Sequence, residues 1–79
     1  MDADEVLARV AARIRERAKA KKMPLRTLAT RVGTSPSQLF GVLSGARNPT
    51  VVWLCRVAEV LECDPGDFFR KPRTKPGGG

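Results

Sequence analysis

The sequence has 79 residues, with 15 Lys and Arg against 8 Asp and Glu, and its formal net charge is +7. It has no His and no Tyr and only two Cys, so it lacks the usual general base near neutral pH and cannot supply the four ligands of a tetrahedral zinc site. We therefore expect neither an enzyme nor a cofactor or metal site. A basic excess of this size in one small domain favours a polyanionic partner, with nucleic acid ahead of an acidic membrane surface.

Neither a secretory signal nor a membrane span is predicted. The N-terminus contains the acidic residues Asp2, Asp4 and Glu5 and no apolar core run. No stretch approaches the ~20 apolar residues that cross a bilayer. Cys55 and Cys63 are expected to be small buried side chains in a reducing compartment. These features predict a cytoplasmic protein without membrane association.

The first predicted helix runs from about residue 4 to residue 21. Leu7, Val10, Ile14 and Ala18 recur at steps of three and four and form one apolar face. Acidic residues at its start and basic residues at its end favour the helix dipole. The basic residues of the other face are expected to be solvated: Arg9, Arg13, Arg15, Arg17, Lys19, Lys21 and Lys22.

The second and third predicted helices follow each other closely. Pro24 is suited to the start of the second helix and Gly33 to its end, because Gly adopts positive φ easily. Ser35 is expected to cap the third helix, with Pro36 at its first position and Gln38 at the capping-box position. The inward apolar residues are Leu25, Leu28, Ala29 and Val32 in the second helix, and Leu39, Val42 and Leu43 in the third.

The remaining elements are also helical. Gly45 ends the third helix, and residues 46–49 form a loop. Thr50 caps a fourth helix, and Asp64 opens a last helical turn. Residues 70–79 contain four bases, two prolines and three terminal glycines, which predicts a basic disordered tail. With no strand pattern, the predicted fold class is all-α, with five short helices in one compact domain over residues 1–69.

Two short helices joined by about three residues that include Gly form the arrangement of a helix-turn-helix, whose second helix can lie in the DNA major groove. Ala29 is small where the helices meet, Gly33 lies in the turn, and Leu39 points inward. The stretch from residue 23 to residue 69 resembles the lambda-repressor-like, or Xre-like (Cro-like), helix-turn-helix family. The matching residues are Leu28-Ala29, Val32-Gly33, Thr34-Ser35, Leu39, Gly45, Arg47-Asn48-Pro49, Leu54, Val57-Ala58, Leu61 and Asp67-Phe68-Phe69.

The resemblance implies a five-helix fold, a homodimer, and regulation of transcription in a bacterial, phage or plasmid system. We therefore expect a nucleoid-associated regulator that binds double-stranded DNA, acts as a repressor on a palindromic operator, and has no small-molecule ligand. Two recognition helices about 34 Å apart would match half-sites one helical turn apart. Alternatives of the same fold are a restriction-modification controller and an antitoxin-type regulator. An alternative of another class is a protein-interaction or RNA-binding module that has lost specific DNA readout.

The family's base-reading positions correspond to Pro36, Ser37, Gln38, Phe40 and Gly41. Pro36 and Gly41 have no side-chain donor, so hydrogen-bonded readout is expected from Ser37 and Gln38. Phe40 is a candidate for contact with a thymine methyl group. Two alternatives stay open, namely that Gln38 returns to the N-cap backbone as a capping-box partner and that Phe40 packs within the protein or an interface.

Phosphate contacts are expected around the third helix, because such contacts set the register on DNA. Members of the resembling family often begin the second helix with Ser-Gln, and the Gln contacts a phosphate. This chain has Pro24-Leu25 there, so the phosphate contact is expected from nearby Lys and Arg side chains. The candidate residues are Lys21, Lys22, Arg26, Thr34, Ser35, Ser44, Arg47 and Asn48. For the last two, the alternative is a solvated turn.

The distribution of charge along the chain supports DNA contacts by the predicted helix-turn-helix. Between Arg17 and Ala58 there is no Asp or Glu, but there are eight Lys and Arg. The helix-turn-helix surface is therefore predicted to be uniformly basic. The aromatic residues Phe68, Phe69 and Trp53 are expected in the core or at the dimer interface.

Overall fold

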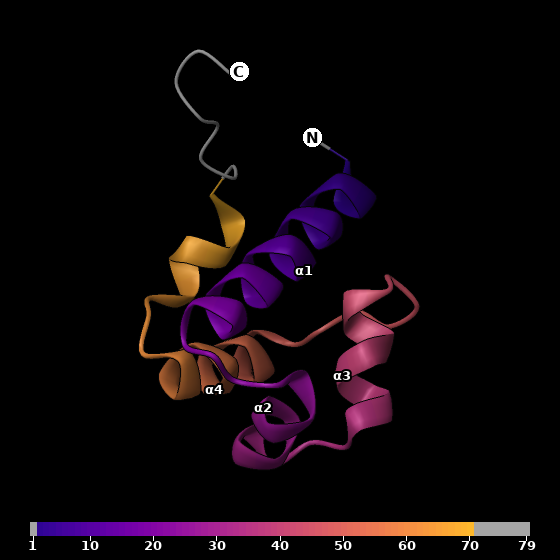
Figure 1. The fold of residues 1–79 in the computed structure, drawn as a ribbon. Coiled ribbons are helices and arrows are strands. Elements are labelled where there is room, and N and C mark those ends of the chain that lie inside the picture. The colour runs from indigo at the N-terminus through magenta and orange to yellow at the C-terminus, as the bar shows by residue number, and fades with distance from the viewer. Residues whose placement is uncertain (1, 71–79) are drawn as a thin grey trace.

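The computed structural model describes residues 2–70 and contains four α-helices and one short 3-10 helix (Figure 1). The elements are α1 (Ala3–Ala20), α2 (Leu25–Val32), α3 (Pro36–Leu43), α4 (Val51–Leu61) and η1 (Pro65–Phe69). The all-α class is confirmed, since residues 2–70 include no strand. The count of five α-helices is not confirmed, because the last element is a 3-10 helix of five residues. Pro and Gly near its start are the poorest α-helix formers.

Local signals determine where the helices begin and end. The Ser35 hydroxyl oxygen accepts a hydrogen bond from the Gln38 backbone N–H at 3.1 Å, and the Thr50 hydroxyl oxygen accepts one from Trp53 N–H at 3.0 Å. Gly33 ends α2 with a φ of 86°, in the left-handed region that Gly tolerates best. These caps confirm the predicted boundaries to within one or two residues.

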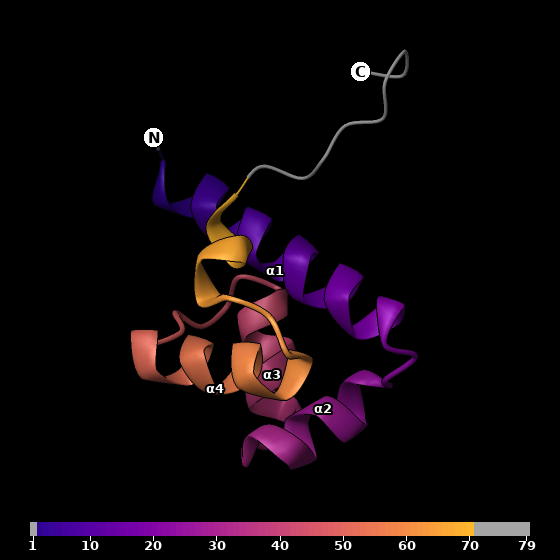
Figure 2. The same cartoon turned by 90° about the vertical axis from the view of Figure 1, so that its left-hand side faces the viewer.

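The core draws side chains from every element. α1 crosses over the other helices and contacts α3 and η1 most extensively, as Figures 1 and 2 show. Val10, Ile14 and Ala18 are buried as predicted, whereas Leu7 is only half-buried and Ala11 joins the core. The remaining buried residues are Leu28, Ala29, Val32, Leu39, Val42, Leu43, Leu54, Val57, Ala58, Leu61 and Phe68.

The structure places Phe68 in the core, one of its two expected locations, and corrects the expectation for Cys55. Phe68 has 0% exposure and packs among core residues of its own chain, so it is not available at a dimer interface. Cys55 is exposed rather than buried, because it lies outside the buried face of α4, which contains Leu54, Val57, Ala58 and Leu61. Cys63 is partly buried, and this burial raises the pKa of its thiol.

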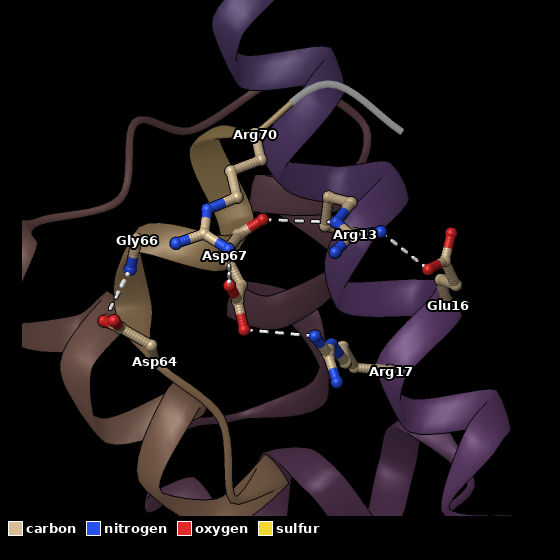
Figure 3. Close-up of polar contacts among 7 residues, drawn as sticks. All are labelled: Arg13, Glu16, Arg17, Asp64, Gly66, Asp67 and Arg70. Carbon is tan, nitrogen blue, oxygen red and sulfur yellow. Dashed lines mark hydrogen bonds and ion pairs between the residues drawn. The ribbon is translucent and has the colours of Figure 1, made fainter. Parts of the chain in front are cut away.

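Three of the four arginines of α1, Arg9, Arg13 and Arg17, bind η1, whereas Arg15 stays exposed; Figure 3 shows the contacts of Arg13 and Arg17. Arg13 Nε donates to the Asp67 carbonyl oxygen at 3.1 Å, and Arg9 donates to the last carbonyl of η1 at 3.2 Å. The Asp67 carboxylate lies between Arg17 at 3.0 Å and Arg70 at 3.1 Å. The expected solvation is thus wrong for Arg13, whose side chain is only 11% exposed because η1 folds back along α1, whereas Arg17 stays 38% exposed.

The structure bears only in part on the predicted tail, on membrane spans and on metal sites. The predicted basic tail falls on residues 71–79, outside the described residues, apart from Arg70 at its start. Among residues 2–70, no helix combines the length and apolar character needed to cross a membrane. The same residues include no group of three or more His, Cys, Asp and Glu side chains placed to hold a metal ion.

Candidate nucleic-acid interface

The helix-turn-helix consists of α2, α3 and the three residues between them. The N–H groups of Gly33 and Thr34 donate to the Ala29 carbonyl oxygen at 3.0 and 2.9 Å, which turns the chain sharply after α2. Ala29 and Leu39 are fully buried where the two helices pack. α3 consequently stands at the edge of the molecule, with one face turned away from the other helices (Figure 1).

The outward face of α3 is small and uncharged. Leu39, Val42 and Leu43 are buried, so the opposite face contains Ser37 and Gly41, which are one helical turn apart. The Ser44 hydroxyl, at the C-terminal end of this face, donates to the Gly41 carbonyl oxygen at 3.1 Å. On its flank, Phe40 is 44% exposed. α3 has no acidic or basic side chain of its own.

Gln38 is oriented by its neighbours before any ligand binds. Its side-chain oxygen accepts a hydrogen bond from the Thr34 hydroxyl at 2.6 Å. The Ser35 cap bonds only the backbone of Gln38, so the predicted return of this side chain to the N-cap backbone is not formed. The side-chain amide N–H groups have no acceptor among residues 2–70, which leaves them available to a base or a phosphate.

Arg47 lies across Gly41, an arrangement that the sequence pattern did not indicate. A Cβ atom at Gly41 would lie 2.8 Å from Arg47 Cδ and 3.1 Å from its Nε. The loop is anchored there, since the N–H groups of Ala46 and Arg47 both donate to the Gly41 carbonyl oxygen, at 2.9 and 3.1 Å. Arg47 also lines a hollow of about 260 Å³ together with Gln38 and Asn48. The sequence did contain one signal for this contact, namely a glycine within a predicted helix, because such a glycine often marks the close approach of another group.

The cations around α2 differ in how strongly they are engaged. Lys21 Nζ is 2.6 Å from a carboxylate oxygen of Glu62, so this predicted phosphate ligand already has a partner. The hydrogen bond and charge of Lys21 lower the pKa of Glu62. Lys22 and Arg26 make no ion pair with any described residue, and Arg31, which was not among the predicted phosphate contacts, is exposed in the same way.

The surface of the helix-turn-helix side is therefore positive. The basic residues between 15 and 47 that have no ion pair to a described residue are Arg15, Lys19, Lys22, Arg26, Arg31 and Arg47. No acidic side chain lies between residues 17 and 58 to neutralise them. A polyanion approaching α2 and α3 therefore meets mainly positive charge, with the Glu62 carboxylate, held by Lys21, in the same hollow as Lys22 and Arg31.

The model of the HTH_3 helix-turn-helix family matches residues 14–68. The chain belongs to this family. The crystal structure of the restriction-modification controller protein C.AhdI from Aeromonas hydrophila has 33% identity and a TM-score of 0.75, over 80% of this chain and 96% of that one. An HTH_3 family transcriptional regulator from Vibrio cholerae shares the fold, with 24% identity and a TM-score of 0.76, over 84% of this chain and 37% of that one. No curated protein matches the sequence.

As an HTH_3 protein, the chain is a DNA-binding regulator, and the predicted resemblance to lambda-repressor-like proteins is confirmed. The structure brings the expected contact residues together around α3. Thr34 and Ser35 lie at its N-terminal end, Ser44 lies at its C-terminal end, and Arg47 and Asn48 lie in the following loop. Pro36 occupies the first helical position, where its missing N–H costs no hydrogen bond.

Three large apolar side chains outside the helix-turn-helix of this HTH_3 chain are exposed. Val51 and Val52 are 73% and 63% exposed at the start of α4, and Phe69 is 45% exposed at the end of η1. Trp53 is partly buried against the core, and its indole Nε1 has no hydrogen-bond partner among the described residues. Of the three aromatic residues predicted at an interface, Phe69 is thus the most accessible.

Proposed function

We propose that this HTH_3 chain is a sequence-specific regulator that represses transcription by binding a palindromic operator as a homodimer. The observation that carries the proposal is the exposed face of α3, which is small enough to enter the major groove and is surrounded by unpaired cations. Phosphates attract such cations regardless of sequence, whereas the groups on α3 supply the contacts that distinguish sequences.

Base readout is assigned to Ser37 and to the unbonded amide N–H groups of Gln38. A hydrogen-bonding side chain of this kind distinguishes base pairs in the major groove. Phe40 lies at the flank of the same face and is suited to contact with a thymine methyl group. The Thr34 hydroxyl holds Gln38 in place, so little side-chain entropy is lost when the contact forms.

Phosphate contacts are assigned to the two ends of the helix-turn-helix. At α2, Pro24 offers no side-chain cap, and the N–H groups of the first turn have no acceptor among residues 2–70. These N–H groups favour an anion, and Lys22 and Arg26 lie next to them. Asn48, in the loop after α3, supplies an amide on the other side of the recognition helix.

The homodimer is assigned to the exposed apolar side chains outside the helix-turn-helix. Val51, Val52 and Phe69 are large exposed side chains of this part of the molecule, and such side chains favour an interface when they form one patch. A two-fold dimer would present two α3 helices to half-sites one turn of DNA apart, about 34 Å.

A controller role in a restriction-modification system is the second candidate. It is supported by the 33% identity to C.AhdI over 96% of that controller's chain. If a selected binding sequence occurs upstream of genes for a restriction enzyme and its methyltransferase in the source genome, this role is favoured over a general repressor role. If the sequence occurs elsewhere, the controller role is refuted.

The decisive experiment measures equilibrium binding to the DNA upstream of the protein's own gene and to random duplex DNA of equal length over a salt series. We expect specific binding to exceed random binding by about 10³-fold or more, with both affinities falling as salt increases. Gln38→Ala should weaken the specific complex selectively. Equal affinity for both duplexes, or preference for RNA, would refute the proposal. A reporter gene downstream of the selected site should lose expression, and a gain would refute repression.

A further inference from the structure

We infer that Arg47 is a base-reading residue, which recognises guanine in the major groove from its position across Gly41. The inference rests on the proposed function and adds the residue and the base to it. The sequence pattern had assigned Arg47 to a phosphate and Gly41 to a base. The packing between them reverses these roles, because Gly41 provides space and Arg47 provides the functional group.

The first step is the position of the Arg47 side chain. Gly41 lies on the same face of α3 as Ser37, opposite the buried Leu39 and Val42. A Cβ atom on Gly41 would point outward from that face. Arg47 Cδ and Nε lie 2.8 and 3.1 Å from that Cβ position, so the side chain occupies the volume that a residue 41 side chain would fill.

The second step is that this position is supported by the backbone. The Arg47 N–H donates to the Gly41 carbonyl oxygen at 3.1 Å, and Ala46 N–H donates to the same oxygen at 2.9 Å. The Cα atom of Arg47 is therefore tied to the last turn of α3 and does not move independently of it. An arginine in a flexible loop would have to be ordered when it binds DNA, which would cost conformational entropy.

The third step is that the guanidinium is uncommitted. It makes no hydrogen bond or ion pair with any residue between 2 and 70, whereas Arg13 and Arg17 are used to hold η1. α3 itself has no charged side chain. Arg47 therefore brings a charged donor to the outward face of the recognition helix.

The fourth step is chemical. The planar guanidinium can donate two parallel hydrogen bonds to guanine O6 and N7, which is the most frequent specific contact in the major groove. Ser37 is too short to form this fork, and the Gln38 amide is suited to adenine. Arg47 and Gln38 line the same hollow, so together they can distinguish adjacent base pairs.

The test is selection of bound sequences from random duplex DNA with the unaltered chain, followed by affinity measurements with Arg47→Ala, Arg47→Lys and Gly41→Ala. Arg56→Ala is the matched control, because Arg56 is also an unpaired exposed arginine but lies on the outer side of α4. We expect the selected half-site to contain a guanine whose replacement by 7-deazaguanine weakens binding. Arg47→Ala should remove this preference, with a loss of about 5- to 150-fold on the selected site, and Arg56→Ala should keep it.

Two variants separate base recognition from charge. Arg47→Lys keeps the charge and a donor that can reach guanine O6 or N7 but not the planar fork, so it should retain only part of the guanine preference, whereas Arg47→Ala should lose it. Gly41→Ala keeps Arg47 but displaces it, and should cause a similar loss while the domain stays folded. The double variant Gly41→Ala with Arg47→Ala should lose no more than Arg47→Ala alone, because Gly41 acts through Arg47.

The outcomes distinguish this inference from the proposed function. If the unaltered chain enriches no sequence, the proposed function fails and the inference fails with it. If a sequence is enriched but Arg47→Ala weakens binding to all duplexes equally and lowers the salt slope by about one, Arg47 is a phosphate contact and only the inference is overturned. An additional loss in the double variant would also overturn it.

Discussion

The two adjacent phenylalanines near the end of the described chain offer the sharpest test of the fold. Phe68 is fully buried and Phe69 is 45% exposed. Removal of a buried Phe side chain typically costs about 3–5 kcal/mol. A domain of this size is stabilised by about 4–10 kcal/mol in total. Phe68→Ala should therefore lose a third of the free energy of unfolding or more, and should release η1 from α1.

Phe69→Ala is the matched control, because the residue type and the chain position are nearly the same. Burial of a whole Phe side chain contributes about 1.5–3 kcal/mol, and Phe69 buries only part of its surface. We expect a cost below about 1.5 kcal/mol in the monomer. Urea unfolding, followed by circular dichroism and by the fluorescence of Trp53, the one tryptophan of the chain, measures both variants.

Protein concentration separates core packing from dimer contacts. A core substitution lowers the free energy of unfolding at every concentration, whereas an interface substitution changes its concentration dependence. We expect Phe68→Ala to act in the first way and Phe69→Ala to include the second. A cost below 1 kcal/mol for Phe68→Ala (a limit set from the range for buried Phe), or a cost that vanishes at high concentration, would refute the assignment of Phe68 to the core.

Three further predictions concern single contacts. Gly33→Ala should lower the free energy of unfolding by about 1–2 kcal/mol in urea titrations, because a φ of 86° strains an L side chain; an unchanged midpoint would contradict this. A double-mutant cycle with Arg17→Ala and Asp67→Ala should give a coupling of about 0.5–1 kcal/mol, since Arg17 is 38% exposed and solvent screens the pair; no coupling at low salt would show that the pair is not stabilising. The pKa of Glu62, measured by NMR, should lie below its usual value and rise towards it in Lys21→Ala. The ion pair therefore stabilises the fold at pH values above the ordinary pKa of Glu, and this contribution is lost as pH falls through the lowered pKa. Equal pKa values in the two proteins would disprove this coupling.

Short-range features of this chain were predictable from the sequence because their causes are local. The caps at Ser35 and Thr50 each involve a backbone N–H three residues later, and the positive φ at Gly33 follows from the absence of a Cβ atom. The apolar spacing in α1 and α4 identified most of the core in the same way. The helix-turn-helix and its position in the chain were thus determined by the sequence alone.

Long-range partners were decided only by the tertiary structure. Two neighbouring phenylalanines have the same local sequence signal, yet the path of η1 buries Phe68 and leaves Phe69 exposed. Likewise, a basic helical face indicates only that its charges need water or partners. It is the return of η1 along α1 that gives Arg13 a carbonyl partner 54 residues away and Arg17 a carboxylate partner 50 residues away.

The proposed binding surface also combines features that the sequence predicts with contacts that only the tertiary structure shows. Composition and spacing predicted that α3 is the recognition helix and that its surroundings are basic. Only the tertiary structure shows that Lys21 is held by Glu62 and that Arg47 covers Gly41, since both contacts depend on how a loop or helix end packs in three dimensions. The physical reason is that helical periodicity specifies the direction in which a side chain leaves its own helix, but not which distant segment lies in that direction.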